Sequence, residues 1–429
     1  MASHTQWKNI RLGDVAKVIS GFAFKSKDFQ QEGIPIIKIK NIRVGAVDLS
    51  EIDHVDSSFL SLDTKYHVKG GDILISLTGS HLTQPNSVVG RVALHSSSLG
   101  HCLLNQRAGK IIITKPDICD KLFLFYSIYT EEKRREIALM ALGAASQANV
   151  SPSQVETVEI KLPPLFIQRK TAAILSAYDR LIENNTRRIE ILEEMARSIY
   201  REWFVKFRFP GHEQVQMVHS ELGLIPEGWE VKKLEKVADI NASTIKPSNA
   251  PEEINYIDIS SVSTGKIDKI EPISLSNASS RARRIVKQGD IIWSTVRPNR
   301  KSYSLILNPI PNLIVSTGFA VVTPKNAPYT YLYHALTTDN FVGYLTNNAT
   351  GSAYPAVNTG DFKNAEVLIP CSELMNKFHN IVADIFSEKD NFLRKNANLR
   401  LTRDLLLPRL ISGEIDVENL DINTGPIAA

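Results

Sequence analysis

The sequence predicts an α+β protein in which two mixed α/β modules form a pseudo-two-fold repeat and are separated by two long antiparallel helices, a coiled coil. Two observations lead to this fold class. The chain carries nearly the same series of motifs twice, about half a chain apart. Each series ends in a long stretch with helical periodicity. Two similar halves in one polypeptide imitate a homodimer, so we expect the protein to touch its target at two places.

Three motifs recur in the same order. The first copies are Trp7 with Leu12 and Val15-Ala16, then Gly71 to Ser76, then Gly109 to Thr114. The second copies are Trp229 with Leu234 and Val237-Ala238, then Gly289 to Ser294, then Gly318 to Thr323. The offset of roughly 210–220 residues is far longer than a solenoid repeat, so each copy must be a whole module.

Composition sets broad limits on the function. A chain of 429 residues suggests two to four domains, and 43% hydrophobic residues is ordinary for a globular protein. The net charge of +4 is too mild to prove nucleic-acid binding, but it is unevenly distributed. Between Arg281 and Lys301 there are 7 basic residues against Asp290 alone. A local basic stretch is typical of a phosphate-binding surface, although a solvated loop is the simpler interpretation of any one charge run.

Three isolated cysteines, Cys102, Cys119 and Cys371, form no C-x-x-C pair, which favours a reducing compartment and argues against structural zinc. The N-terminus has no apolar signal region, and no window approaches the length of a membrane span. We therefore expect a soluble cytoplasmic protein without a membrane partner.

The first module covers residues 1–164 and alternates short apolar runs with turn residues. Strands are predicted at Ile34–Ile39, Asp72–Ser76, Val88–Leu94 and Lys110–Thr114, and one helix at Asp120–Met140. The second module covers 210–371 and begins with the polar linker Gly211–Gly228. A short acidic tail follows at 414–429.

Two long helical regions follow the modules, at 165–209 and 372–413. Apolar residues recur there at steps of mostly four and three, and residues 165–209 contain neither Gly nor Pro. A helix of this length needs a partner helix, so we expect the two to pack antiparallel. The predicted core of the helix pair is Ile174, Tyr178, Leu181, Asn185, Leu192, Ile199, Phe378, Ile381, Ile385, Phe392, Leu399 and Leu406. Glu388 and Lys395 also fall on the second stripe and interrupt it.

No catalytic constellation stands out. The sequence lacks a P-loop, an H-E-x-x-H pair and a G-x-S-x-G elbow. Asp117, Glu131 and Lys133 loosely fit the pattern of a metal-dependent nuclease, but the last two lie in a predicted helix rather than on a strand. We expect no catalytic residue and no metal site, and keep two alternatives open: a nuclease and a helical protein-interaction scaffold.

Polar loops that follow equivalent strands are the predicted DNA-binding surface. Asn and Gln side chains pair with adenine edges, and Arg and Lys with guanine or phosphate. The loops after Ser76 and Ser294 differ strongly although the strands before them match, as two unlike half-sites would require. The candidates in the first module are Lys25, Lys27, Lys38, Lys40, Asn41, Arg43, Thr78, Ser80, His81, Gln84, Asn86, Arg91, Asn105, Gln106, Arg107 and Gln147. Those in the second are Lys246, Ser260, Ser261, Arg297, Asn299, Arg300, Lys301, Tyr303, Thr317 and Tyr354.

Taken together and in this order, the motifs resemble the specificity (S) subunit of type I restriction–modification systems over nearly the whole chain. The resemblance is carried by the two Trp starts, the two Gly-Asp strands and the turn Gly21 to Lys25. It is also carried by the helix entries Pro163-Pro164-Leu165 and Ile369-Pro370, and by the helix ends Ser198 to Val205 and Leu405 to Ile415.

The resemblance implies two target recognition domains, each of which reads half of a bipartite, asymmetric site in double-stranded DNA. It implies that the helices set the spacer and dock two modification (methyltransferase) subunits, with restriction/translocase subunits added for host defence. The chain itself would bind no cofactor. S-adenosylmethionine for adenine methylation, ATP and Mg would belong to the partner subunits.

Overall fold

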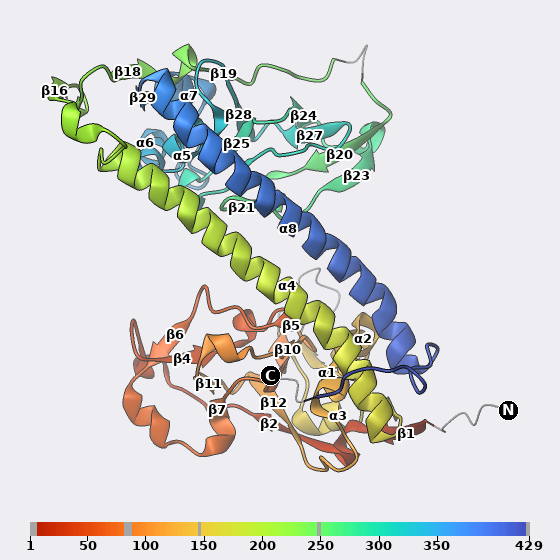
Figure 1. Ribbon diagram of the computed structural model, residues 1–429. Helices are drawn as coiled ribbons and strands as arrows, with labels where there is room; N and C mark the ends of the chain where they lie inside the picture. Colours follow the sequence, from red (N-terminus) through yellow and green to blue (C-terminus); the bar gives the residue numbers. More distant parts are fainter. Residues whose placement is uncertain (1–6, 81–87, 145–146, 247–249, 426–429) are drawn as a thin grey trace. The chain divides into compact units, whose positions relative to one another are not determined.

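The computed structural model describes residues 7–80, 88–144, 147–246 and 250–425, and it divides into two compact units. Unit 1 comprises residues 1–184 together with 396–429, and unit 2 comprises 185–395. The boundaries cut both long helices, so each unit contains one α/β module and a segment of each helix (Figure 1).

Unit 1 is built on two small sheets. One has the order β2-β12-β8-β10-β5 and the other the order β3-β6-β4-β11-β7. The strands of the first are β2 (Ala16–Ser20), β12 (Ala108–Ile113), β8 (Ile73–Ser76), β10 (Val92–Leu94) and β5 (Gly45–Ala46). Those of the second are β3 (Phe29–Gln30), β6 (Asp53–Val55), β4 (Ile34–Ile37), β11 (Cys102–Leu104) and β7 (His67–Val68).

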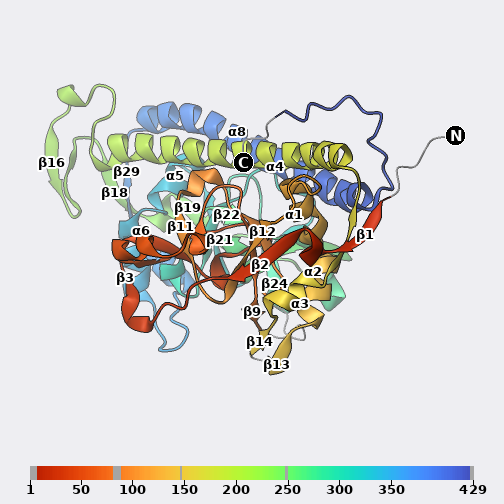
Figure 2. The same cartoon turned by 90° about the horizontal axis from the view of Figure 1, so that it is seen from below.

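The other elements of unit 1 lie around these sheets. β1 (Lys8–Arg11) pairs with β15 (Glu159–Leu162). β9 (Thr78–Gly79), β14 (Gln147–Asn149) and β13 (Leu142–Ala144) form a third small sheet, which Figure 2 shows as one group. The helices of the module are α1 (Lys121–Tyr129), α2 (Glu131–Leu139) and α3 (Pro152–Glu156).

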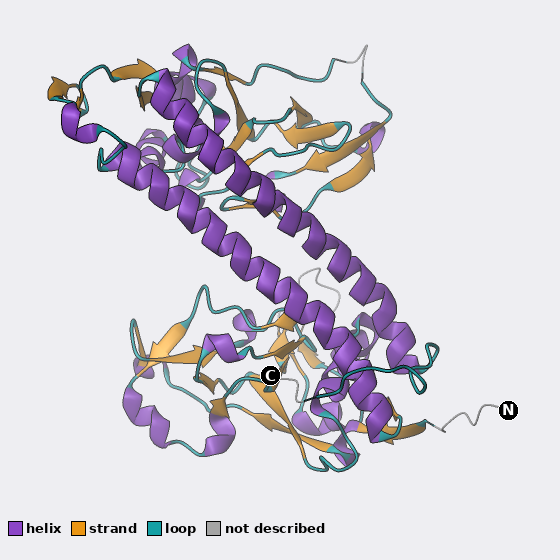
Figure 3. Cartoon of the chain, viewed as in Figure 1, coloured by secondary structure: helices purple, strands orange, loops and turns teal. Residues whose placement is uncertain are grey.

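Unit 2 repeats this plan (Figure 3). Its sheets have the orders β19-β28-β25-β26 and β23-β20-β27-β24. The strands are β19 (Ala238–Ile240), β28 (Phe319–Pro324), β25 (Ile291–Ser294), β26 (Tyr303–Leu305), β23 (Glu271–Ser274), β20 (Glu253–Ile257), β27 (Leu313–Ser316) and β24 (Ala282–Ile285). In both units the second sheet contains one parallel pair, β4 with β11 and β20 with β27. The predicted internal repeat is therefore confirmed at the level of topology.

The remaining elements of unit 2 complete the correspondence. β18 (Glu230–Lys233) pairs with β29 (Glu366–Ile369), as β1 does with β15. The helices are α5 (Tyr329–Ala335), α6 (Asp339–Asn348) and α7 (Thr359–Asn364). The hairpin of β21 (Val262–Ser263) and β22 (Lys266–Ile267) corresponds to the antiparallel bridge between Ile42 and Val47 in unit 1. The hairpin of β16 (Met217–Ser220) and β17 (Gly223–Pro226) has no counterpart among the described residues of unit 1.

The duplicated Gly-Asp motif forms the same turn in both units. Gly71 and Gly289 have φ of 78° and 85°, a region that glycine enters without strain. The carboxylate after each glycine accepts the backbone N–H three residues earlier, at 3.0 Å in unit 1 and 2.8 Å in unit 2. The motif recurs because it fixes the entry to β8 and β25.

One detail of the predicted repeat is wrong. The backbone N–H of Leu77 donates to the carbonyl of Arg107 at 3.0 Å, and that of Thr295, at the same distance from its Gly-Asp turn, donates to Gly318 at 2.8 Å. Gly318 therefore corresponds to Arg107, two residues before Gly109. A shift of two residues leaves the same side chains on each face of a strand, so the hydrophobic pattern could not reveal it.

Two predicted elements in unit 1 are shorter than expected. The helix predicted at Asp120–Met140 is two helices, because Thr130 has an extended backbone and its hydroxyl caps α2 by accepting the Lys133 N–H at 3.3 Å. The strand predicted from Val88 begins at Val92, since Gly90 has φ of 75°.

The long helices are α4 (Leu165–Tyr200), which continues as a π-helical turn at Arg201–Val205, and α8 (Ser372–Ser412). In unit 1, Asp179 pairs with Arg403, and the Ile182 carbonyl accepts from Asn396 Nδ2 at 3.3 Å. In unit 2, Glu193 pairs with Lys389. Rising numbers on α4 meet falling numbers on α8, so the predicted antiparallel pairing is confirmed in each unit.

The predicted core of the helix pair needs correction at two positions. Leu181 and Ile381 are 51% and 44% exposed, whereas their neighbours Ile182 and Val382 are buried. Phe378, Ile385 and Asn185 are buried as predicted. The other predicted core residues, Ile174, Tyr178, Leu192, Ile199, Phe392, Leu399 and Leu406, are partly buried. Glu388 and Lys395 are exposed and do not interrupt the seam.

The chain after α8 packs back onto unit 1. Val417 is buried in the same apolar core as Leu175 and Leu407. Lys170 Nζ donates to the carbonyl oxygens of Glu418 and Leu420 at 2.7 and 2.8 Å. In unit 2, Phe209 and Ile225 from the chain after α4 occupy the core beside Trp229. Each module is thus completed by the segment that follows a long helix.

Candidate nucleic-acid interface

The loop between β25 and β26 is the best defined part of the predicted DNA-binding surface. Arg297 has φ of 50°, and its backbone N–H donates to the carbonyl of Pro355 at 2.7 Å. Its Nη2 donates to the carbonyl of Ala353 at 2.9 Å, and the guanidinium lies 4.5 Å from the ring centroid of Tyr354. Tyr354 is 69% exposed. Backbone and side chain are therefore fixed together at the protein surface, and this arrangement suits a fork that reads a base edge or a phosphate.

The rest of this loop divides into exposed and occupied side chains. Asn299 and Arg300 are exposed. Lys301 pairs with Asp339 at 2.8 Å and is still 43% exposed. Tyr303, which the sequence places among the candidates, is 7% exposed, and its ring packs on Trp293 with centroids 4.8 Å apart.

A second basic group in unit 2 lies on β24 and beside it. Arg281 and Arg283 are exposed, as are Thr317 and Lys246. Thr317 donates its backbone N–H to the Arg281 carbonyl at 2.8 Å, which places this threonine beside the arginines. Ser260 is exposed, but its hydroxyl and N–H both donate to Asp258, at 2.9 and 3.0 Å. Ser261 is partly buried.

Unit 1 offers fewer free side chains than predicted. His81, Gln84 and Asn86 lie outside the described residues. Lys25, Lys27, Gln106, Arg107 and Gln147 are exposed, and Ser80 is partly exposed. Gln147 stands on β14, which pairs with β9 at the start of the loop after Ser76. Tyr354 and Gln147 hold corresponding places, because Ala356 and Asn149 are the bridge partners of Val296 and Thr78.

Three candidates in unit 1 are buried rather than exposed, because their polar groups serve the fold. Asn41 is 2% exposed, and its Nδ2 donates to the carbonyls of Asp48 and Glu51 at 2.9 and 3.0 Å. Thr78 is 7% exposed and donates to Asn149 Oδ1 at 2.7 Å. Asn105 is also buried, and its Oδ1 accepts from the Arg107 N–H at 3.4 Å.

Of the remaining basic candidates of unit 1, three form ion pairs and the fourth, Arg91, lines a hollow. Lys38 and Lys40 both pair with Asp53, at 3.1 and 3.2 Å, and Arg43 pairs with Asp48 at 3.2 Å. Arg91 is half-buried and lines a hollow of about 760 Å³ together with residues of α2 and the last turns of α8. Burial and the nearby Arg134 lower the pKa of Arg91.

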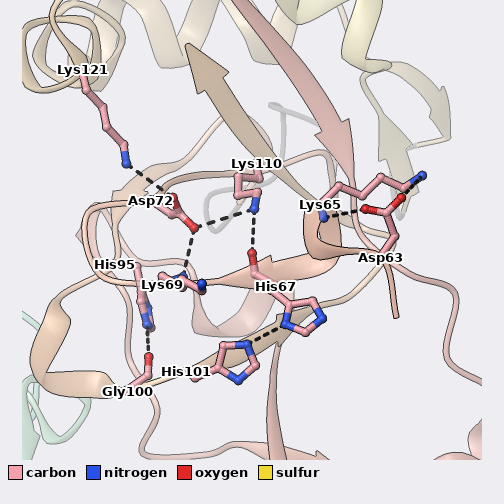
Figure 4. Close-up of polar contacts among 10 residues, drawn as sticks. All are labelled: Asp63, Lys65, His67, Lys69, Asp72, His95, Gly100, His101, Lys110 and Lys121. Carbon is pink, nitrogen blue, oxygen red and sulfur yellow. Dashed lines mark hydrogen bonds and ion pairs between the residues drawn. The ribbon is translucent and has the colours of Figure 1, made fainter. Parts of the chain in front are cut away.

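Lys110, a buried lysine that the sequence did not single out, lies beside the Gly-Asp turn of unit 1 (Figure 4). Lys110 Nζ donates to the carbonyl of His67 at 2.6 Å and lies 3.8 Å from Asp72, which also pairs with Lys121 at 3.4 Å. His67 and His101 share a hydrogen bond of 2.9 Å between Nδ1 and Nε2. Burial lowers the pKa of Lys110 and of His101. The cluster ties the Gly-Asp turn to β12 and β7.

The residues of the alternative nuclease site have other partners. Glu131 pairs with Arg134 at 2.7 Å and Lys133 with Glu136 at 2.7 Å, both along α2. Asp117 is exposed. Across the part of the chain that the structure describes, no group of three or more His, Cys, Asp or Glu residues is placed to hold a metal ion. Within the same part, no helix is long and apolar enough to cross a membrane.

The chain therefore contains two modules of one fold, and each module has exposed basic and amide side chains, among them Gln106 and Arg107 in unit 1 and Asn299 and Arg300 in unit 2. The family model for the type I restriction modification DNA specificity domain matches residues 4–194 and again 226–401. The chain belongs to this family, with two copies of its specificity domain. It is a specificity subunit of the type I restriction–modification class, whose role is the recognition of DNA sequence.

Relatives and solved structures resemble the chain over its full length. The type I restriction enzyme MjaIX specificity subunit of Methanocaldococcus jannaschii is 25% identical, over 96% of this chain and 94% of the relative. The EcoBI specificity subunit of Escherichia coli is 21% identical, over 100% of this chain and 91% of the relative. The crystal structure of a type I restriction–modification S subunit from M. genitalium has a TM-score of 0.59 at 16% identity, and the match covers 96% of this chain and 97% of that one. This last likeness supports the fold.

Proposed function

We propose that the chain reads a bipartite, asymmetric site in double-stranded DNA, with one half-site assigned to each unit. The observation that carries this proposal is the contrast between a repeated scaffold and unlike loops. The Gly-Asp turns and sheet orders match, whereas the sequence has Arg297, Asn299 and Arg300 in the loop of unit 2 and Gly79, His81 and Leu82 at the corresponding positions of unit 1. Different side chains on one scaffold suit different base sequences.

A second part of the proposal concerns the partner subunits. Large apolar side chains are exposed on α4, among them Phe166, Ile191 and Met195 at 46, 52 and 49%. Exposed apolar residues on a helix favour a protein partner. We propose that this helix surface docks two modification subunits and, through them, the restriction subunits.

The proposed division of labour leaves catalysis to those partners. S-adenosylmethionine, ATP and Mg would be bound by them, and this chain would supply only sequence recognition. Within α2, Glu131 pairs with Arg134 and Lys133 pairs with Glu136. These ion pairs support the assignment, because neither side chain is directed to a shared site with Asp117.

The test is binding of the purified full-length chain to duplex DNA with randomised sequence, followed by recovery of the bound sequences. We expect two short motifs separated by an unspecific spacer, and affinity that falls steeply with salt. A single uninterrupted motif would contradict the bipartite proposal. Cleavage with Mg²⁺ that is lost in Asp117→Ala would favour the nuclease instead.

A further inference from the structure

Arg284 is the most poorly satisfied charged side chain on the basic surface of unit 2. It lies on β24, where the register with β27 shifts between Ala282 and Arg284. Such a β-bulge changes the direction of the side chains around it. Arg283 is consequently exposed, while Arg284 is half-buried.

The guanidinium of Arg284 has one acceptor, the carbonyl of Thr317, at 3.2 Å from Nη2. Its Nε and Nη1 are buried and have no hydrogen-bond partner among the described residues. No carboxylate in the described part of the chain forms an ion pair with it, and burial alone lowers its pKa. Arg283 on the same strand and Arg281 just before it add like charge.

A buried charge with unpaired donors destabilises the fold in which it sits. Arg284 therefore contributes less to the folded state than an apolar side chain of the same length would. Among the described residues, β24 places no carboxylate against the guanidinium. The neighbouring segment, in which Thr244 forms a β-bridge with Arg284, places none there either. An acceptor that arrives from outside the described residues would compensate the two unpaired donors.

We infer that Arg284 is a ligand for a DNA phosphate that is folded back against the protein in the free chain. On binding of the second half-site, the guanidinium leaves the carbonyl of Thr317 and pairs with a backbone phosphate beside Arg281 and Arg283. The inference rests on the proposed function of unit 2. A phosphate is the better acceptor than a base edge, because Arg281 and Arg283, at the start of β24 and on it, are exposed and positive, and Arg284 is set back from them.

Leaving the folded-back position is easy, because only one hydrogen bond to a neutral carbonyl is broken. Outside this position, Nε and Nη1 of Arg284 can donate hydrogen bonds to water or to a phosphate. An arginine reaches a phosphate with two parallel N–H donors, a geometry that lysine cannot reproduce.

The experiment compares the full-length chain with Arg284→Met and Arg284→Lys. The matched control is Lys269→Met, which removes the same charge from an exposed position of unit 2 that pairs with Glu271 at 2.9 Å. Affinity for duplex DNA is measured across a salt series, and thermal unfolding is measured without DNA. We expect Arg284→Met to bind about tenfold more weakly at low salt. We also expect its salt dependence to fall by about one unit and its melting temperature to stay level or rise.

We expect Arg284→Lys to keep the salt dependence and to lose part of the affinity, and Lys269→Met to change neither. A lower melting temperature for Arg284→Met overturns the inference, because Arg284 would then stabilise the fold. Unchanged DNA binding by Arg284→Met also overturns it, because Arg284 would then make no contact with DNA. A loss confined to one base position of the second half-site overturns the phosphate assignment. If the unaltered chain shows no salt-sensitive binding to duplex DNA, the proposed function itself fails, and this outcome is distinct from both.

Discussion

Arg297 is held at the surface by two backbone carbonyls and the ring of Tyr354, so little freedom remains to be lost when it meets DNA. We expect Arg297→Ala to weaken binding of the second half-site by about 1–3 kcal/mol if it reads a base edge. Lys325→Ala, at a lysine paired with Asp239 on the same unit, is the control. Binding to duplexes altered at single positions checks this. Equal loss on every duplex would identify a phosphate contact instead.

His334 is a buried histidine that is neutral in the folded protein. It is 7% exposed and stacks against Tyr200 and Phe386, with centroids 5.5 and 5.6 Å away. Burial, assisted by the positive charges of Arg197 and Lys389, lowers its pKa to about 3 from the ordinary 6.5. Between these values the unfolded chain binds the proton and the folded chain does not. The stability from the neutral ring is thus complete above about pH 6.5 and is lost as the pH falls toward 3.

We expect the free energy of unfolding to drop by about 2–3 kcal/mol between pH 7 and roughly pH 4.5 from this residue. Urea unfolding at both pH values measures the drop, and His334→Phe should remove that part of it. An equal drop in the variant would place the pH dependence elsewhere.

At the level of single residues, the sequence identified exposed arginines such as Arg107 and Arg300, but it did not show which polar side chains are buried. Asn41, Thr78 and Tyr303 stand in polar loops, yet each is turned inward by hydrogen bonds or packing with residues distant in the chain. Those partners are set by tertiary structure, so composition and spacing could not reveal them.

Among the elements, the helix pair combines an apolar seam with partly buried ion pairs. The side chains of Arg403 and Lys389 are only 14% and 12% exposed, and they bind Asp179 and Glu193 on the opposite helix. Asp179 also accepts from the hydroxyl of Tyr126 at 2.5 Å. The contacts of Asp179 tie α8 to α4 and to α1 within unit 1, and the pair of Lys389 with Glu193 ties α8 to α4 within unit 2.

We expect Arg403→Met to reduce the free energy of unfolding by about 1–3 kcal/mol, because Asp179 loses its ion partner in a half-buried site. Arg394→Met is the control, since Arg394 is 59% exposed and pairs only with Asp390 one turn away, and it should cost under about 0.5 kcal/mol. Chemical denaturation measures both. Similar losses of unfolding free energy in the two variants would mean that the burial of Arg403 does not strengthen its ion pair with Asp179.

Helix periodicity gave the existence and length of both helices, because an uninterrupted apolar stripe is a strong signal. It did not give the seam at single-residue precision. Leu181-Ile182 and Ile381-Val382 each offer two adjacent apolar residues, and only tertiary packing decides which one is buried.

Both long helices contribute to both units, so their length should govern the spacing of the two half-sites. Because α4 and α8 pair in antiparallel register, four residues are inserted in each, after Asn184 and after Lys395. This adds roughly 6 Å, which is one or two base pairs of duplex at about 3.4 Å each. We expect the preferred spacer to lengthen by that amount while both half-site sequences stay the same. An unchanged spacer in a folded variant would show that the helices do not set the distance.

At the level of the complete chain, the protein contains two copies of one module. The segment that follows each long helix completes a core: Val417 in unit 1, and Phe209 and Ile225 in unit 2. The sequence revealed this duplication because the Trp and Gly-Asp motifs each serve a local turn or core that both units need. It could not reveal the sheet orders, which join segments distant in the chain.

If each unit reads its own half-site, exchange of one module between relatives should transfer one half-site. Residues 229–369 would be replaced by the corresponding segment of a family member with a different site, leaving both long helices unchanged. The site recognised by the hybrid would be determined by binding selection or, with modification subunits, by mapping methylated positions. We predict that the second half-site changes to that of the donor while the first half-site and the spacer stay the same. A hybrid that folds and changes both half-sites, or neither, would contradict the account.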